Sequence, residues 1–309
     1  MQRKMPGKEK TNCSERRLVL RAYAKVNLSL EILGQRADGY HELVTVLQTV
    51  SLCDRLTLES LPEGGIEVRC DHPAVGSGPD NLAYRAARAF QQALAERRGV
   101  RISLAKRIPV GSGLGGGSSD AAATLGGLNC LWSAGWSEEE LRTLAAELGS
   151  DVPFFLGGGT CLGEGRGERL TPLPSLPETA LVLVFPPDAG ISTAEVYRAL
   201  AGKVQAAGAR TRALIAALEA GDLEGVIAQG WNDLEAVVFA RRPELQKAAE
   251  GMRACGLRGV RLTGSGAALY GFVEPAASAR LVARLRERLP GYWLRVVEPV
   301  SRGWEEERV

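Results

Sequence analysis

The first part of the chain carries the alternation of apolar and polar residues that is typical of β-strands. From Arg17 onward, RLVLRAYAKVNLSLEIL is rich in aliphatic and β-branched residues, which predicts one or two strands. Alternation resumes over Leu43–Leu58, and shorter strands are predicted at Gly65–Cys70 and Val100–Leu104. These segments indicate an early sheet.

Segments with apolar residues at helical spacing lie between these strands and after them. Asn81–Arg97 has apolar positions on one helical face, and the alanine-rich segment Asp120–Trp132 predicts a second helix. Ser137–Glu140 has the sequence of a capping box and opens a helix that runs to Gly149. Three prolines between residues 172 and 177 then mark a linker.

The second half of the chain has its own order of elements. A strand, a long helical region that starts at a second capping box, two paired strands, a helix and a final strand follow one another. This β-α-β-β-α-β order predicts a ferredoxin-like domain with an enlarged first crossover. The segments are Ala180–Phe185, Ser192–Glu195 as the box with helix to Cys255, Val260–Thr263, Ala268–Val273, Ser278–Leu289 and Tyr292–Val297.

Length and the linker together predict two domains, because 309 residues exceed one typical core. We expect a disordered basic tail over residues 1–17, an N-terminal domain over 18–178 and a C-terminal domain over 179–309. The tail lacks the apolar core of a signal peptide. The longest clean apolar run, Ala180–Phe185, is too short to span a bilayer, so a cytoplasmic protein is expected.

Charge and residue counts exclude several function classes. The net charge is +2, from 38 basic and 36 acidic side chains, which gives no strong field for nucleic acid or membrane partners. Six scattered cysteines without a C-x-x-C pair indicate free thiols. Only two histidines, His41 and His72, are present, which excludes a multi-histidine metal site. Nothing in the pattern indicates an oligomeric state.

A glycine- and serine-rich segment before the helix at Asp120 carries the clearest chemistry. Glycines let backbone N–H groups approach a ligand closely, and a helix N-terminus adds free donors and partial positive charge. Together they predict a site for the phosphates of ATP. Ser118 and Ser119 add hydroxyls suited to phosphate or Mg²⁺. The segment is Pro109, Val110, Gly111, Ser112, Gly113, Leu114, Gly115, Gly116, Gly117, Ser118 and Ser119.

Other interpretations of this segment fit less well. A flexible linker rarely ends on a strong helix. Gly111, Gly113 and Gly116 satisfy G-x-G-x-x-G, but a Rossmann site would follow the first strand of a β-α-β unit. No Gly-Lys-Ser/Thr of a Walker A loop follows, and the partner motifs of protein kinases are missing from the sequence. The segment is therefore a phosphate loop of a third kind.

Three motifs in order resemble those of the GHMP kinases, named for galactose, homoserine, mevalonate and phosphomevalonate. They are Ala22–Leu28, Pro109–Ser119 and Leu262–Ala268. The resemblance implies an α+β, two-domain GHMP-kinase fold, with a ribosomal-protein-like N-terminal domain and a ferredoxin-like C-terminal domain. It also implies an enzyme that uses ATP with Mg²⁺, whose carboxylate ligand the sequence does not identify.

Further stretches resemble one branch of this family. They are Gly34–Leu43, Gln48, Asp54, Asp80–Leu82 and Gly149–Phe154, and the similarity runs from about Leu18 to Val297. This branch phosphorylates the 2-hydroxyl of a methylerythritol unit carried on cytidine diphosphate, in the non-mevalonate route to isoprenoids. The resemblance implies a small-molecule cytidine diphosphate substrate.

The resemblance also implies catalytic roles for two residues. Asp151 would accept the proton of the substrate hydroxyl as the phosphoryl group transfers, and Lys25 would face and orient it. By itself, the local sequence favours a turn or helix cap for Asp151, and the alternation does not exclude an outward surface position for Lys25. Asn27, two residues after Lys25 on a strand, is expected on the same face.

The remaining site residues are expected by the same resemblance. Tyr40 and Tyr197 would stack on the two faces of cytosine, and His41 would bind its edge. Asn81 and Lys106 would lie near the adenine. Thr193 and the second glycine loop, Gly264, Ser265 and Gly266, would lie near the substrate, although that loop also fits a plain hairpin turn.

Two other functions remain open at this point. One is a non-catalytic sugar or nucleotide sensor on the same fold, which the presence of both Lys25 and Asp151 argues against. The other is a dinucleotide oxidoreductase that uses the G-x-G-x-x-G match.

Overall fold

A long antiparallel hairpin forms the backbone of the first sheet in this computed structural model, which describes residues 16–37, 39–62, 64–95, 98–187, 192–200 and 208–307. Strand β1 (Arg17–Gln35) pairs with β2 (His41–Leu61), with irregularities after Tyr23, Asn27 and Ile32 that bend it. The alternation thus predicted this strand correctly: of the one or two strands expected here, the structure has one. The expected tail lies outside the described residues apart from 16 and 17, and Arg17 already belongs to β1.

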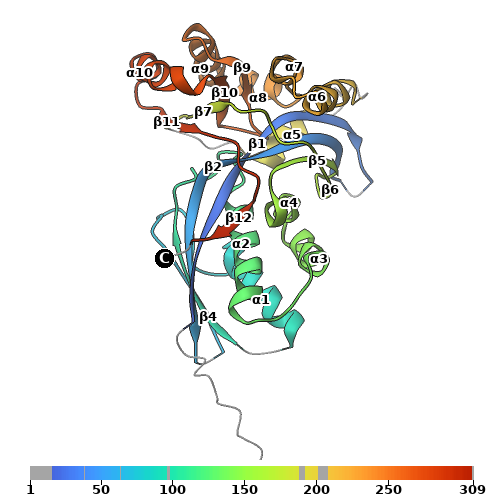
Figure 1. Ribbon diagram of the computed structural model, residues 1–309, viewed down its shortest axis with the longest axis vertical. Coiled ribbons are helices and arrows are strands. Elements are labelled where there is room, and N and C mark those ends of the chain that lie inside the picture. Colours follow the sequence, from blue (N-terminus) through green and yellow to red (C-terminus); the bar gives the residue numbers. More distant parts are fainter. Residues whose placement is uncertain are drawn as a thin grey trace, which may run out of the picture.

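The first sheet has the strand order β12-β1-β2-β4-β3, and it branches where β2 changes partner. The second half of β2 pairs with β4, whereas its first half pairs with β5. The branch lies where the hairpin of β1 and β2 extends toward the second unit (Figure 1). The other strands are β3 (Ile66–Cys70), β4 (Gly99–Ala105), β5 (Thr160–Gly165), β6 (Arg169–Pro172), β8 (Trp231–Asn232) and β12 (Trp304–Glu306).

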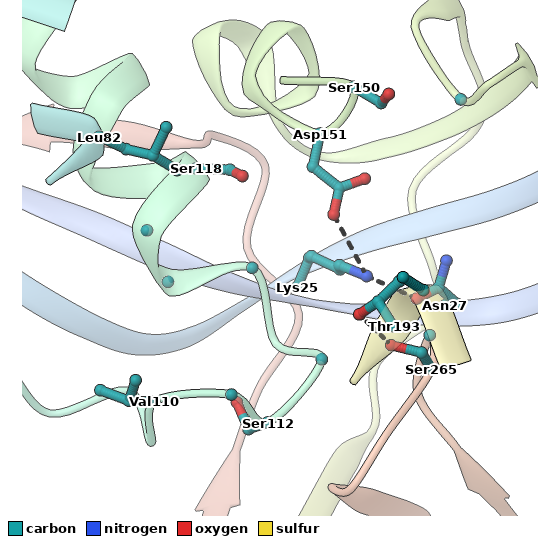
Figure 2. Close-up of a pocket in the computed structure, with 18 of the residues that line it drawn as sticks. Lys25, Asn27, Leu82, Val110, Ser112, Ser118, Ser150, Asp151, Thr193 and Ser265 are labelled. Carbon is teal, nitrogen blue, oxygen red and sulfur yellow. Dashed lines mark hydrogen bonds and ion pairs between the residues drawn. The ribbon is translucent and has the colours of Figure 1, made fainter. Parts of the chain in front are cut away.

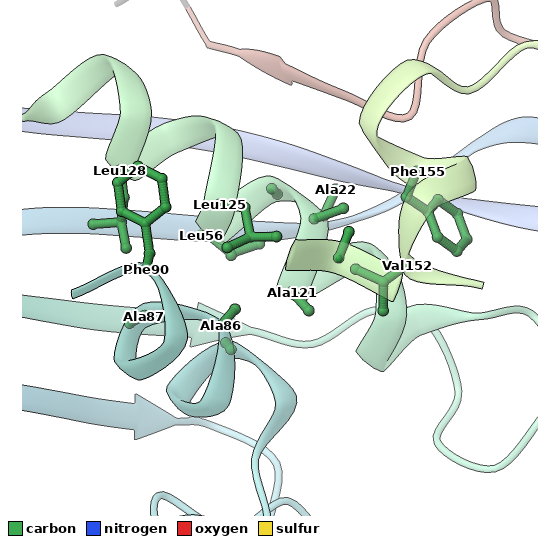
Figure 3. Packing of buried hydrophobic residues seen from close by; sticks show 14 of the residues in the cluster. Ala22, Leu56, Ala86, Ala87, Phe90, Ala121, Leu125, Leu128, Val152 and Phe155 are labelled. Carbon is green, nitrogen blue, oxygen red and sulfur yellow. The ribbon is translucent and has the colours of Figure 1, made fainter. Parts of the chain in front are cut away.

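Four helices lie on one side of this sheet, with α2 at their centre (Figure 1). Helix α2 contacts β1 and β2 on the sheet side and α1, α3 and α4 around it, so most of its residues are buried. Alanine residues such as Ala121 let these neighbours approach closely (Figure 3). The helices are α1 (Leu82–Leu94), α2 (Gly116–Leu131), α3 (Glu138–Leu148) and α4 (Val152–Gly157).

The starts of these helices test the local sequence signals. The capping box at the start of α3 is confirmed, because Ser137 and Glu140 each bond to the other's backbone N–H. The predicted start of α2 at Asp120 is wrong by four residues. Gly115 adopts a left-handed conformation with φ of 75°, and the N–H of Ser119 donates to its carbonyl, so the last loop residues form the first helical turn.

The second unit is a four-stranded antiparallel sheet with the order β11-β7-β10-β9. The chain passes through β7, helices, β9, β10, α10 and β11, which confirms the ferredoxin-like order. The second capping box is wrong: Ser192 starts a helix but is exposed and makes no side-chain capping bond. The elements are β7 (Ala180–Phe185), α5 (Thr193–Ala199), α6 (Ala209–Glu219), α7 (Leu223–Gln229), α8 (Glu235–Arg241), α9 (Pro243–Ala254), β9 (Arg258–Leu262), β10 (Leu269–Val273), α10 (Ser278–Arg288) and β11 (Trp293–Val297).

Alternate residues of β7 pack into two different cores. Val182 and Val184 pack with α8, α9 and α10, whereas Leu181 and Leu183 point to the opposite face. On that face they join residues of β1, β2, α6 and α7, including Val26. The second core therefore holds the hairpin of the first sheet against the sheet of the second unit.

The end of the chain returns to the first sheet and crosses the expected boundary at residues 178 and 179. Strand β12 pairs with β1, with Ala22 opposite Trp304 (Figure 1). The short strand β8 also pairs with β1. Two segments that the sequence assigns to the second domain thus complete the first sheet.

The indole of Trp304 packs directly on Gly126 of α2, which gives a test of this closure. A Cβ atom on Gly126 would lie 2.2 Å from the Trp304 ring, so Gly126→Ala must displace the indole and is expected to cost about 1–3 kcal/mol of unfolding free energy. Chemical denaturation measures this. Gly78→Ala is the control, because a Cβ there meets nothing within 4 Å. Equal stability of the two variants would contradict the packing.

None of the helices in the described ranges has the length and apolar character needed to cross a membrane.

Candidate functional site

A cleft of about 1170 Å³ lies where the two units meet. Its walls come from β1, the start of β2, the glycine loop, the start of α4, α5 and the β9–β10 loop. Figure 2 shows Val110 and Ser118 on one side of Lys25 and Asp151, and Thr193 and Ser265 on the other. The cleft therefore gathers residues from both halves of the chain around one lysine–aspartate pair.

The glycine loop is held in a conformation that only glycine adopts easily. Gly111, Gly113 and Gly115 have φ of 69°, 81° and 75°. A Cβ on Gly113 would lie 2.5 Å from the backbone oxygen of Thr263, so the loop presses against the second unit. Beyond Gly115 the first-turn N–H groups of α2 have no intrahelical acceptor, and they lie at the edge of the cleft.

Most of the predicted loop residues line the cleft, but two do not. Leu114 is fully buried in the core, and its carbonyl accepts a bond of 3.0 Å from the N–H of Lys25. Ser119 is also fully buried, and its hydroxyl faces the protein interior. Leu114 lies before helix α2 and Ser119 in its first turn, and both side chains point into the core, so their expected contact with ATP stays a prediction. Ser112 lines the cleft, but its hydroxyl donates to the Pro109 carbonyl at 2.6 Å and shapes the loop.

The topology of the loop excludes the Rossmann interpretation. The loop follows β4, which is parallel to β3 and antiparallel to β2. A dinucleotide site requires the first strand of a parallel β-α-β unit, and α2 packs against the antiparallel hairpin instead.

Lys25 and Asp151 come together from β1 and the start of α4. Lys25 is 4% exposed, and its ammonium lies 3.7 Å from the Asp151 carboxylate and donates to Asn27 at 2.7 Å (Figure 2). The surface position considered for Lys25 is therefore wrong. Asp151 does occupy the N-cap position of α4, but its side chain makes no capping bond and is free to face Lys25.

Asn27 shares the face of β1 with Lys25, as predicted, and is fixed by a polar network that the sequence did not reveal. Its amide donates to Thr45 at 2.9 Å, and its Oδ1 accepts from Thr263 at 3.2 Å. Asn232 of β8 donates to the carbonyls of Leu262 and Gly264, each at 2.8 Å. These bonds tie the second glycine loop to β1 and so fix the position of the lysine.

Lys106 is engaged in a buried ionic cluster below the glycine loop. Its ammonium contacts the carboxylates of Asp54 and Asp120, the latter at 2.6 Å, and all three side chains are at most 5% exposed. Burial opposes the charge on the lysine, but the two carboxylates outweigh it and raise the pKa of Lys106. Lys106 borders the cleft, so its predicted role near adenine stays a prediction.

This cluster holds two carboxylates but only one ammonium, and we therefore expect the stability of the protein to depend on pH. Burial raises the pKa of Asp120 from 3.8 to about 7; the Lys106 charge opposes the shift and the Asp54 charge adds to it. The folded chain thus keeps a proton that the unfolded chain releases, so this contribution is complete below pH 3.8 and is lost as the pH rises through about 7. The free energy of unfolding of Asp120→Asn should therefore rise relative to that of wild type as the pH increases from 5 to 8, as measured by chemical denaturation. A constant difference across this range would contradict the assignment.

Asn81 lies at the rim of the cleft and caps α1. Its Oδ1 accepts from the N–H of Ala83 at 2.9 Å and its amide donates to the Gly76 carbonyl at 2.8 Å. Val75 and Leu82, apolar residues to which the sequence assigned no role in binding, line the same part of the cleft. A contact between Asn81 and adenine remains a prediction.

The three predicted aromatic residues all line the cleft. The rings of His41 and Tyr197 are in contact, with centroids 5.1 Å apart, and Tyr40 is 54% exposed. Burial, assisted by the negative charge of Asp151, raises the pKa of Tyr197, which keeps its phenol protonated. An aromatic surface thus extends from the exposed Tyr40 toward Asp151.

The second glycine loop joins this surface from the other unit. The hydroxyls of Thr193 and Ser265 are 2.8 Å apart and connect α5 with the β9–β10 loop (Figure 2). Gly264 and Ser265 line the cleft, whereas Gly266 lies against Leu262 behind it, so the expected direct role of Gly266 stays a prediction. The loop also joins two antiparallel strands, so the hairpin interpretation holds as well.

The polar groups of the cleft suit a metal ion that arrives with a nucleotide. No group of three or more His, Cys, Asp or Glu side chains able to hold a metal exists among the described residues. Asp120 is held by Lys106, while Ser118 faces the cleft. Mg²⁺ is commonly bound through few protein ligands plus phosphate oxygens, so this arrangement fits it.

Comparison with known proteins places the chain in a family. Residues 81–159 match the model of the GHMP kinases N terminal domain, and residues 214–291 match that of the GHMP kinases C terminal region. The chain belongs to the GHMP kinases and is an ATP-dependent small-molecule kinase. The resemblance and the two-domain α+β fold expected from the sequence are confirmed.

Particular relatives narrow the comparison. A protein of Gloeobacter violaceus named 4-diphosphocytidyl-2-C-methyl-D-erythritol kinase is 42% identical over 92% of this chain and 95% of its own length. A protein of Moorella thermoacetica with the same name is 45% identical over 88% of this chain and 96% of its own length. A crystal structure of 4-(cytidine 5'-diphospho)-2C-methyl-D-erythritol kinase matches with a TM-score of 0.76 and 41% identity, over 91% of this chain and 99% of that one. Homoserine kinase from Cytophaga hutchinsonii shares the fold, with a TM-score of 0.77 at 17% identity, over 98% and 100% of the chains.

Proposed function

We propose that this chain transfers the γ-phosphoryl group of ATP to the 2-hydroxyl of 4-diphosphocytidyl-2-C-methyl-D-erythritol, a step of the non-mevalonate route to isoprenoids. The observation that carries the proposal is the Lys25–Asp151 pair, 3.7 Å apart, between a phosphate-binding loop and an aromatic surface. Relatives of 42% and 45% identity that bear the name of this kinase support the choice of substrate.

In the proposed reaction, Asp151 accepts the proton of the substrate hydroxyl while its oxygen bonds to the γ-phosphorus. The bond between that phosphorus and the bridging oxygen of ATP breaks, and ADP leaves with the electron pair. Lys25 orients the Asp151 carboxylate, because its buried ammonium lies 3.7 Å from it. Asn27 in turn holds the ammonium in place.

The loop supplies the electrostatic part of the reaction. The free N–H groups of the first turn of α2 and the glycine backbone would bind the β- and γ-phosphates. Mg²⁺ bound with ATP would neutralise phosphate charge, and the Ser118 hydroxyl would hold it from the protein side. Asn81 and Lys106 would border the adenine.

The aromatic surface accounts for the choice of a pyrimidine substrate. Tyr40 and Tyr197 would stack on cytosine, and His41 would hydrogen-bond to its edge. The contact between His41 and Tyr197 supports a preformed wall for one face of cytosine, and the exposed Tyr40 would cover the other face. Thr193, Gly264 and Ser265 would contact the methylerythritol unit next to Asp151.

A comparison of substrates tests the proposal. ADP release would be measured with ATP and Mg²⁺ in the presence of 4-diphosphocytidyl-2-C-methyl-D-erythritol, homoserine or mevalonate, and the product identified by phosphorus NMR. The expected result is turnover of the cytidine compound alone, with a new phosphomonoester signal. Turnover of homoserine or mevalonate without turnover of the cytidine compound would overturn the proposal.

A further inference from the structure

Four cationic side chains among the described residues line the cleft, and their surroundings differ. Lys25 faces Asp151, and Lys106 is enclosed by Asp54 and Asp120. Two arginines, Arg166 and Arg198, line the same cleft. Arg198 has no carboxylate partner among the described residues, and it is exposed. The arginine pair therefore carries positive charge that the proposed catalytic residues do not use.

Arg166 is held beside the aromatic surface by two contacts. Its guanidinium lies over the ring of Tyr40, with Cζ 4.9 Å from the ring centroid. Glu168 is directed mainly at the backbone of the same turn, since its carboxylate accepts from the N–H of Arg166 at 2.6 Å but lies 3.9 Å from the guanidinium. The Arg166 side chain is 30% exposed, and its guanidinium makes no hydrogen bond within the part of the chain that the structure describes.

Arg198 reaches the same region from the opposite wall. It follows Tyr197 on α5, and the Tyr197 ring contacts His41, the neighbour of Tyr40. Arg166 contacts Tyr40 and His41 contacts Tyr197, and chain neighbours connect these two contacts with each other and with Arg198. The glycine loop lies on the other side of Lys25 and Asp151 from Thr193 (Figure 2). The phosphates of ATP that this loop would bind are therefore a different group from the one that the arginines would bind.

We propose that Arg166 and Arg198 bind the diphosphate of the cytidine substrate and so select a nucleoside diphosphate ester over a free nucleoside. This inference rests on the proposed function. A substrate whose base lies on the aromatic surface and whose hydroxyl reaches Asp151 must carry its diphosphate between them, within the cleft that both arginines line. Planar guanidinium groups bind phosphate oxygens in a bidentate manner. Stacking on Tyr40 orders Arg166 before the substrate arrives, which lowers the entropic cost of binding.

Calorimetric titration with CDP and with cytidine tests the inference. A saturating non-hydrolysable ATP analogue and Mg²⁺ occupy the glycine loop, so both probes report on the aromatic end. Wild type is expected to bind CDP more tightly than cytidine. Arg166→Gln and Arg198→Gln should each lower this preference by at least about tenfold, through weaker CDP binding with nearly unchanged cytidine binding. An unchanged preference in either variant removes that arginine from the site.

Two controls separate the possible failures. Arg169→Gln removes the same charge from the same hairpin, but Arg169 is 64% exposed and pairs with Glu42 at 3.2 Å, so the preference should stay as in wild type. Arg166→Lys should restore only part of the preference, because lysine keeps the charge and loses the planar stack. If wild type binds neither probe, the proposed function fails. If wild type binds CDP tightly and Arg166→Gln keeps its preference, only the arginine assignment fails.

Discussion

Replacing Asp151 with asparagine is expected to lower kcat by about 10²- to 10⁴-fold, the usual contribution of a general base. The amide has nearly the same shape as the carboxylate but cannot accept the hydroxyl proton. Because Asp151 is a capping-position residue without a capping bond, helix α4 should persist and the KM for the cytidine substrate should change little. Steady-state kinetics with a thermal melt of the same preparation measures both.

The control for this variant is Asp80→Asn, which makes the same change of charge at an exposed position on the rim of the cleft. Its kcat should remain within about threefold of wild type, since the side chain is exposed and makes no ion pair with Lys25 in the part of the chain that the structure describes. If Asp151→Asn were as active as Asp80→Asn, another group would have to accept the proton and the central role of Asp151 would be lost.

Replacing Lys106 with methionine is expected to cost about 3–5 kcal/mol of unfolding free energy at pH 8. The variant keeps most of the side-chain volume but leaves Asp54 and Asp120 buried without their shared counter-charge. Lowering the pH should restore part of the loss. The Lys106 charge lowers the pKa of Asp120 in wild type, so the variant takes up a proton there more readily. Chemical denaturation at pH 6 and pH 8 measures both effects.

Lys247→Met is the matched control for this substitution, because Lys247 is exposed on α9. It should change stability by no more than about 0.5 kcal/mol. An equally small effect for Lys106→Met would mean that the two carboxylates are not held by the lysine. A large effect that does not diminish at lower pH would point to lost packing instead of unpaired charge.

The glycine loop shows how far local sequence signals reach. Its composition predicted a phosphate site, because the requirement for left-handed glycines and free N–H groups lies within eleven consecutive residues. The same composition misplaced the start of α2, since Gly116–Ser119 are poor helix formers in isolation. Packing of α2 among α1, α4 and the hairpin overrides that preference.

The proposed catalytic pair could not be derived from sequence spacing. Lys25 lies in a strand and Asp151 at a helix start more than 120 residues later, and only tertiary packing brings them to 3.7 Å. From the local pattern, Lys25 could equally have been a surface residue, and the family resemblance alone predicted the pair. The structure supplies the physical reason for the pairing: a lysine buried at 4% exposure needs an acidic partner.

The ionic cluster and the final strand show what sequence patterns omit. Lys106 resembles any strand lysine, because its two partners lie in β2 and α2, and neither position carries a local signal. Strand β12 is only three residues long and pairs with the first strand of the chain. Short segments with distant partners carry too little periodicity for prediction.

The most direct test of the account is a crystal structure with a non-hydrolysable ATP analogue, Mg²⁺ and 4-diphosphocytidyl-2-C-methyl-D-erythritol bound together. The account predicts the triphosphate on the glycine loop, cytosine between Tyr40 and Tyr197, and the 2-hydroxyl about 2.6–3.2 Å from the Asp151 carboxylate. A complex in which that hydroxyl faces another group, or in which the cytosine lies away from the aromatic surface, would contradict it.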